Sequence, residues 1–287
     1  MAKKLLIIDS NSVIHRAYHA LPPLTTKDGK VVGAVYGFLL VFFKALNEFK
    51  PDFVAACFDV KGPTFRHEKF EGYKAKRPPL PEDLGEQIEM VKNLLPVFNV
   101  PVFGKEGFEA DDLIGTIAAK AFNDDSLEII IVSGDTDTMQ LVNERTKVYN
   151  LRKGVKDTVL YDVEKVKEKY QGLEPKQLLD LRALKGDPSD NIPGVPGVGE
   201  KTAIELLKEY GTLDNVYENV ALTKGKLREK LTEHKEEAFS SKELAEIVKD
   251  VPIDFNLENC RWASYNKDEA KEALKGFEFY SLIDRLP

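Results

Sequence analysis

The chain has 287 residues, of which 43% are hydrophobic and 31% are charged, and its formal net charge is −7. This composition excludes a wholly disordered chain and suffices for one large domain or two smaller ones with hydrophobic cores. No segment approaches the ~20 apolar residues of a membrane helix, and the apolar run behind the basic N-terminal residues is too short for a signal peptide. Cys57 and Cys260 lack metal-ligand spacing, so we expect a cytoplasmic protein with reduced thiols and no membrane partner.

The acidic balance neither supports nor excludes a nucleic-acid partner, because the distribution of charge decides such binding. The sequence has 48 acidic and 41 basic residues. Nine of the acids are assigned to a metal site below, and the 39 that remain nearly balance the 41 bases. Net charge is therefore uninformative for this chain.

Three apolar runs, over residues 4–8, 53–58 and 128–132, predict buried strands. They are nearly continuous in apolar residues, which is typical of parallel strands covered on both faces. Helices are predicted over residues 33–49, 81–95 and 109–122. This alternation predicts an α/β fold over residues 1–165, with a central, mostly parallel sheet flanked by helices.

From about residue 161 the strand-like runs stop. Helices are predicted over residues 175–184, 200–210 and 226–249, and the first two are separated by a segment rich in glycine and proline, residues 186–199. We place a boundary near residue 165 and expect residues 166–287 to form a helical subdomain.

An aspartate follows the end of each predicted strand: Asp9 and Asp59 directly, and Asp135 after Ser133 and Gly134. In α/β sheets, ligands bind beyond the carboxyl ends of the strands, so these side chains are candidates for one site. Further acids occur in small groups at a helix start, after Asp135 and at the head of the Gly/Pro-rich segment: Glu109, Asp111, Asp112, Asp137, Asp187 and Asp190.

Each acidic group alone is ordinary at a helix start or in a turn. Brought together, unpaired carboxylates repel one another and need cations. Hard oxygen donors without His or Cys favour Mg²⁺, for which Mn²⁺ substitutes, over zinc. Two such ions about 3.5–4 Å apart are a recurring arrangement for phosphodiester hydrolysis. The sequence therefore predicts a carboxylate-rich site for two ions.

Residues 61–81 interleave bases with aromatic rings, including Phe65, Arg66, Tyr73, Lys74 and Arg77. Basic side chains neutralise phosphates, and aromatic rings stack on unpaired nucleobases. The alternative is a solvated helix whose rings pack on the core, but the position directly after Asp59 favours the nucleic-acid interpretation. His15 and His19 have helical spacing, and we expect them to be structural.

The Gly/Pro-rich segment continues into a predicted helix with a possible phosphate-binding turn, formed by Gly194, Gly197, Gly199, Lys201 and Thr202. Glycines allow close backbone approach, and a helix start presents N–H groups. The pattern is not a Walker loop, because no strand precedes it. A helix–hairpin–helix over about residues 186–211 is favoured, which grips a DNA backbone without reading its sequence; an ordinary tight turn is the alternative.

These segments together resemble the 5′-nuclease domain of bacterial DNA polymerase I, a relative of phage and eukaryotic flap endonucleases. The resemblance runs nearly end to end and is densest in Ile8-Asp9-Ser-Asn-Ser, Thr64-Phe65-Arg66-His67, Glu109-Ala-Asp111-Asp112, Ser133-Gly-Asp135-Thr-Asp137 and Gly186-Asp187-Pro-Ser-Asp190-Asn. It implies a PIN-like core, a basic arch formed by residues 61–81, and a C-terminal helical subdomain that binds DNA.

The resemblance also implies roles. Asp9, Asp59, Glu109, Asp111 and Asp112 would surround the more tightly held ion, and Asp135, Asp137, Asp187 and Asp190 the second. Catalysis would depend on Asp59 and Asp111, and on Arg66 and Lys74, which approach the scissile phosphate. Phe65 or Tyr73 would stack on a base, and Arg16, Arg77 and Arg182 would contact phosphates. Lys201 and the hairpin would hold duplex DNA, with K⁺ in the hairpin loop.

The implied reaction is a two-metal hydrolysis near a 5′ end that leaves a 5′-phosphate and a 3′-hydroxyl. Expected substrates are 5′ flaps, nicks, branched ends and RNA–DNA hybrids, and a DNA polymerase is an expected partner, linked or separate, of a monomeric chain. The sequence departs from the family pattern at Thr136 and Thr138, where a base and a large apolar residue are usual. This departure weakens the expectation for the second ion.

Two alternatives come from other functional classes. Asp135-Thr-Asp137-Thr138 after an apolar strand is similar to the nucleophile motif of haloacid dehalogenase phosphatases, although that family places the motif on its first strand. The second alternative is a DNA-binding module that has lost catalysis. The complete set of acids argues against it.

Overall fold

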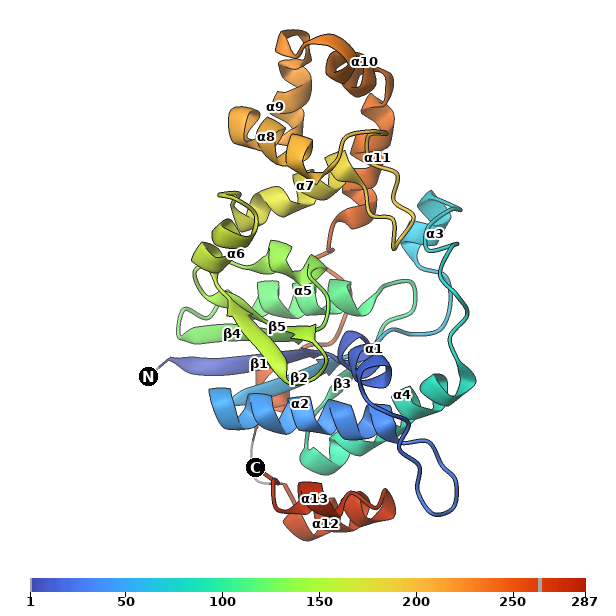
Figure 1. Ribbon diagram of the computed structural model, residues 1–287. Coiled ribbons are helices and arrows are strands. Elements are labelled where there is room, and N and C mark those ends of the chain that lie inside the picture. The colour runs from blue at the N-terminus through green and yellow to red at the C-terminus, as the bar shows by residue number, and fades with distance from the viewer. Residues whose placement is uncertain (1, 263–264) are drawn as a thin grey trace.

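The computed structural model describes residues 2–262 and 265–287, and its centre is a six-stranded sheet in the order β3-β2-β1-β4-β5-β6 (Figure 1). The first five strands in this order are parallel, and only β6 runs antiparallel, against β5. The strands are β1 (Lys3–Asp9), β2 (Phe53–Cys57), β3 (Val102–Phe103), β4 (Leu127–Ser133), β5 (Thr146–Lys153) and β6 (Asp157–Tyr161). The predicted α/β class is confirmed, although sequence patterns do not predict β3, β5 and β6.

Successive residues of the central strands enter two different cores. In β1, Leu5 and Ile7 belong to the core on the side of α5 (Ala110–Ala121), whereas Leu6 and Ile8 belong to the core on the opposite face. Both faces of the sheet are therefore buried, which explains why the strands lack polar alternation.

The second face is covered by α1 (Ser10–Ala20), α2 (Gly33–Phe49) and α4 (Glu82–Leu94). Helix α2 has the predicted bounds. Gly37 lies where α1 and α2 meet, and a Cβ there would stand 2.6 Å from the Cβ of Ala17. This close approach fixes α1 against the sheet, with Asp9 at its N-terminal cap.

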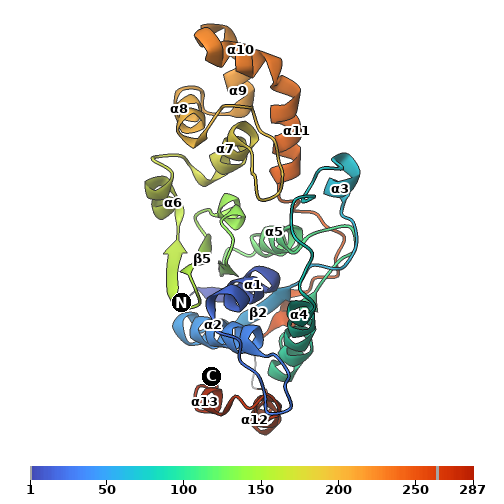
Figure 2. The ribbon, with the colours of Figure 1, turned by 45° about the vertical axis from the view of Figure 1, so that its right-hand side comes forward.

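A helical unit stands above the sheet at one end of the molecule (Figures 1 and 2). Its helices are α6 (Val163–Lys169), α7 (Leu178–Lys185), α8 (Glu200–Tyr210), α9 (Leu213–Glu218), α10 (Gly225–Glu233) and α11 (Lys235–Ala245). The single helix predicted over residues 226–249 is wrong. The backbone leaves helical geometry at His234 (φ −110, ψ 31), and the last helix ends at Ala245 because Glu246 is extended.

The C-terminal helices α12 (Lys267–Gly276) and α13 (Tyr280–Ile283) lie at the opposite end of the molecule, next to α2 (Figures 1 and 2). Leu274 and Leu282 are fully buried in the core beneath α2. This part of the region expected to be helical and to bind DNA thus packs on the α/β core. Among the described residues, no helix is long and apolar enough to span a membrane.

Candidate active site

A cavity of about 340 Å³ opens at the carboxyl ends of β1, β2 and β4. The basic arch covers one side of it, with α3 (Phe65–Lys69) standing beside α11 (Figure 2). Twelve of the predicted site residues line the cavity: Asp9, Arg16, Asp59, Arg66, Tyr73, Lys74, Arg77, Glu109, Asp111, Asp135, Asp137 and Asp190.

Four carboxylates on the floor of the cavity have no lysine or arginine within ion-pair distance among residues 2–262 and 265–287: Asp9, Asp59, Asp111 and Asp135. Asp9 accepts hydrogen bonds from Ser12 N–H (3.2 Å) and Ser133 Oγ (2.6 Å). Asp59 accepts one from Ala110 N–H (2.7 Å), and Asp135 one from Asp137 N–H (2.9 Å). These partners orient the carboxylates but bring no positive charge.

Burial and the charges of neighbouring acids make three of these carboxylates, Asp9, Asp59 and Asp111, costly to ionise. Burial raises the pKa of Asp9 to about 6, and the charge of Asp135 adds to the rise. Burial also raises the pKa of Asp111 well above its ordinary value, with further contributions from Asp9 and Asp135. The pKa of Asp59 is raised by burial, although the N–H of Ala110 opposes the change. A cation in the cavity would relieve all of these penalties at once.

The donor set fits a hard divalent cation, since it consists of carboxylate oxygens without sulfur or imidazole. In the described part of the chain, however, no three such side chains converge closely enough to surround an ion as they stand. Ionised carboxylates repel one another, and a bound cation would offset this repulsion.

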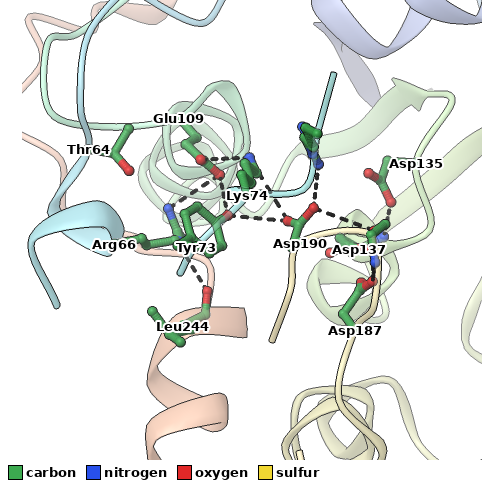
Figure 3. Close-up of polar contacts among 12 residues, drawn as sticks. Thr64, Arg66, Tyr73, Lys74, Glu109, Asp135, Asp137, Asp187, Asp190 and Leu244 are labelled. Atoms are coloured by element: carbon green, nitrogen blue, oxygen red, sulfur yellow. Dashed lines mark hydrogen bonds and ion pairs between the residues drawn. The ribbon is translucent and has the colours of Figure 1, made fainter. Parts of the chain in front are cut away.

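The remaining acids of the site already form ion pairs with lysine and arginine side chains. Lys74 Nζ lies 2.6 Å from Glu109 and 3.9 Å from Asp190, and Arg77 also pairs with Asp190 (Figure 3). The hydroxyl of Tyr73 donates to both acids, at 3.0 and 3.3 Å. Burial raises the pKa of Glu109, but Lys74 and then Arg66 outweigh it, so that the pKa is lowered overall.

Arg182 of α7 pairs with Asp137 and lies 3.4 Å from Asp187 (Figure 3). This guanidinium supplies a positive charge beside Asp137, where the family pattern would place a base at position 136. Thr138 is fully buried, and its hydroxyl donates to the carbonyl of Asp135 at 3.2 Å. The departures at Thr136 and Thr138 therefore leave Asp137 with a partner and the loop with a hydrogen bond.

Asp112, expected as a metal ligand, and Arg66, expected as a phosphate contact, are paired with each other in the free protein. The Arg66 side chain is 3% exposed and donates two hydrogen bonds of 2.7 Å to Asp112, which is 0% exposed. Arg66 also donates to the carbonyls of Leu244 and Glu246. Asp112 accepts further bonds from backbone N–H groups at residues 109 and 248, and it does not line the cavity. The pair anchors the arch to α5 and to the end of α11.

The aromatic residues of the arch are also packed. Tyr73 is 3% exposed and lies in a small apolar cluster with Ile192 and Leu244. Phe65 packs against Phe108, with a centroid distance of 5.8 Å, and lies under the guanidinium of Arg66. Both rings are therefore already in contact with other side chains in the free protein.

The histidines of α1, which we expected to be structural, lie at the cavity. His15 and His19 line the cavity together with Arg16, whose Nη2 donates to the carbonyl of Gly134 at 2.9 Å. Burial lowers the pKa of His15, as do the neighbouring His19 and Arg77. Their spacing of four residues, on a helix that starts at the Asp9 cap, was a signal that they share the face turned towards the site.

The glycine-rich part of the predicted hairpin, residues 194–202, forms a tight loop before α8 and does not line the cavity. Gly194 has φ +60, and a Cβ there would stand 2.2 Å from the backbone N of Gly186, so only glycine fits. Gly197 has φ +78 and accepts a hydrogen bond from Lys230. Gly199 caps α8, and Lys201 and Thr202 occupy its first turn, where Lys201 is exposed.

Two family models match the chain: "5'-3' exonuclease, N-terminal resolvase-like domain" over residues 4–171 and "5'-3' exonuclease, C-terminal SAM fold" over residues 173–268. Among curated proteins, DNA polymerase I of Caldicellulosiruptor bescii is 46% identical over 285 residues, which are 99% of this chain and 33% of that protein. The chain thus spans about a third of the length of the curated relatives it matches.

Solved structures show the same fold. The T5 D15 protein, co-crystallised with metal ions, aligns with a TM-score of 0.72 at 20% identity and covers 99% of both chains. The catalytic core of Rad2 in complex with DNA substrate aligns with a TM-score of 0.63 at 20% identity, over 99% of this chain and 93% of that one. Asp135 and Asp137 follow the fourth strand of the chain, whereas the phosphatase alternative requires the first.

Proposed function

Because the chain belongs to the 5′-3′ exonuclease family, we propose that it hydrolyses phosphodiester bonds of DNA near 5′ ends, as a 5′-3′ exonuclease and flap endonuclease. The observation that supports this most is the group of four carboxylates without salt bridges beneath a basic arch, at the carboxyl ends of parallel strands. The products would be a 5′-phosphate and a 3′-hydroxyl.

Asp9, Asp59, Asp111 and Asp135 would hold the divalent cation, which we propose to be Mg²⁺, with Mn²⁺ as a substitute. A second ion would be surrounded by four further acids, once the lysine and arginine side chains that pair with them are displaced: Glu109, Asp137, Asp187 and Asp190. When bound, such ions lower the pKa of the attacking water and offset the negative charge that develops on the phosphate. We leave Asp112 out of this set because it forms a buried pair with Arg66.

The basic side chains on the cavity wall would bind and orient the DNA backbone. Lys74 and Arg77 are held by Glu109 and Asp190 in the free protein. A scissile phosphate is negatively charged like these acids, so it would replace them as the partner of Lys74 and Arg77. Arg16 projects from α1 into the same cavity and would contact a neighbouring phosphate.

The hairpin would hold duplex DNA at a distance from the cavity. Exposed N–H groups at the start of α8, together with Lys201 and Thr202, suit a backbone phosphate. A K⁺ ion in the hairpin loop, RNA–DNA hybrids as substrates, and a DNA polymerase as a linked or separate partner remain part of the proposal. The polymerase is supported by the name of the curated relatives.

Cleavage of a labelled 5′-flap duplex tests the proposal. We expect cleavage in Mg²⁺, none in EDTA, and recovery on adding Mn²⁺. Asp111→Asn should abolish cleavage yet leave binding of the flap duplex within about twofold, because Asp111 has no hydrogen bond or ion pair among the described residues and supplies only negative charge. Glu258→Gln, an exposed acid distant in sequence, is the control. Cleavage in EDTA, or no cleavage of any branched DNA in Mn²⁺, would refute the proposal.

A further inference from the structure

The tip of the arch is hydrogen-bonded to the head of the hairpin loop, more than a hundred residues away in the chain. The side-chain amide of Asn191 donates to the carbonyl of Gly72 at 2.7 Å, and the N–H of Lys74 donates to the carbonyl of Asp190 at 2.9 Å. These two bonds flank Tyr73. The backbone of the arch is thus held on both sides of one residue by neighbouring residues of the loop.

Lys74 needs such support because its backbone is in the left-handed region, with φ +55. This conformation is unfavourable for a lysine, since its Cβ approaches the following carbonyl. Asn191 has φ +57, but asparagine tolerates this region well. The strained residue is therefore Lys74, whose ammonium group points into the cavity. Asn191, which holds the arch backbone beside it, adopts the same conformation without such strain.

The contact is built on both sides. On the arch, a Cβ added to Gly72 would stand 3.0 Å from Nδ2 of Asn191 and 2.7 Å from the ring of Phe70. Glycine at position 72 therefore leaves the room through which the amide reaches the carbonyl. On the loop, Asp187 and Ile192 exchange two backbone hydrogen bonds of 2.9 Å that close the turn around Asn191.

We propose that Asn191 is a positioning residue for Lys74: its amide fixes the arch backbone so that the ammonium group of Lys74 stays over the carboxylates. The inference rests on the proposed function, because it requires Lys74 to act on the scissile phosphate. It adds that the loop leading into the DNA-gripping hairpin holds the ammonium group of Lys74 in a fixed position over the cavity.

The test measures the single-turnover rate of flap cleavage and the Kd for the flap duplex. Asn191→Asp keeps the size and the left-handed tolerance but cannot donate, and Asn191→Gly keeps the backbone alone. For both we expect the rate to fall about tenfold, the equivalent of one hydrogen bond, with Kd changed less than twofold. Asn219→Ala is the control, since Asn219 also donates to a backbone carbonyl, at 2.9 Å, outside the site.

A double-mutant cycle separates positioning from general damage. In the Lys74→Ala background, Asn191→Asp should change the rate less than twofold, because no ammonium group remains to position. Hydrogen exchange of the arch amides should also be faster in Asn191→Asp. An equal loss in both backgrounds, or an unchanged rate in the single variant, would overturn the inference. If Lys74→Ala itself cleaves normally, the proposed role of Lys74 fails first, and that result is distinguishable from failure of the Asn191 contact.

Discussion

Replacing Arg66 by methionine should unfold the protein more easily rather than disable its chemistry alone. The guanidinium of Arg66 makes four hydrogen bonds, two of them to the carboxylate of Asp112, whose side chain is 0% exposed. Arg66→Met keeps most of the apolar stem but leaves that carboxylate buried with backbone N–H partners only. Removing one partner of a buried ion pair costs about 3–5 kcal/mol. For a chain of this size, the melting temperature should fall by roughly 6–20 °C.

Urea denaturation, with thermal melting in parallel, measures this change. Lys69, on the same helix as Arg66, provides the control. It lies 2.8 Å from Glu243 of α11, and the two side chains are 51% and 62% exposed, so Lys69→Met should cost less than about 1 kcal/mol. The double variant Arg66→Met/Asp112→Leu should recover most of the loss, because no unpaired charge stays buried. If Arg66→Met were as stable as the parent but bound flap DNA weakly, Arg66 would be a phosphate contact and our structural assignment would be refuted.

Two further predictions concern the cavity and the hairpin. Burial raises the pKa of Asp9 from 3.8 to about 6, so the folded chain keeps a proton that the unfolded chain has lost. In EDTA, the free energy of unfolding should therefore fall as the pH rises from about 4 to about 6, and Asp9→Asn should flatten that part of the urea-midpoint profile; an unchanged profile would contradict the burial argument. Lys201→Ala should weaken binding to duplexes of any sequence and reduce the salt slope by about one unit, whereas a sequence-dependent loss would argue against a backbone grip.

The sequence predicted the fold wherever the pattern is local. Helix α2 is apolar on nearly every side and α8 is bounded by glycines, so both have their predicted ends. Strands β5 and β6 were not predicted, because both contain several polar side chains. The break between α10 and α11 at His234 was not predicted either, since the apolar residues over 226–249 keep helical spacing through it.

For the site, the sequence identified which residues gather but not how they pair. The strand-end aspartates were predictable because topology alone brings them to one edge. The partnership of Arg66 with Asp112 spans 46 positions and depends on how the arch folds back on α5, which no local pattern encodes. A carboxylate that faces a buried arginine and one that faces an open cavity look alike in the sequence.

The arch is attached by ion pairs that differ in exposure. Near its start, Arg66 is 3% exposed and its ion pair with Asp112 is shielded from solvent ions. Near its end, the side chain of Arg77 is 49% exposed, so salt or a competing anion can screen its pair with Asp190. The two attachments should therefore differ in salt sensitivity: the Arg66 pair should persist at high ionic strength, whereas the Arg77 pair should weaken.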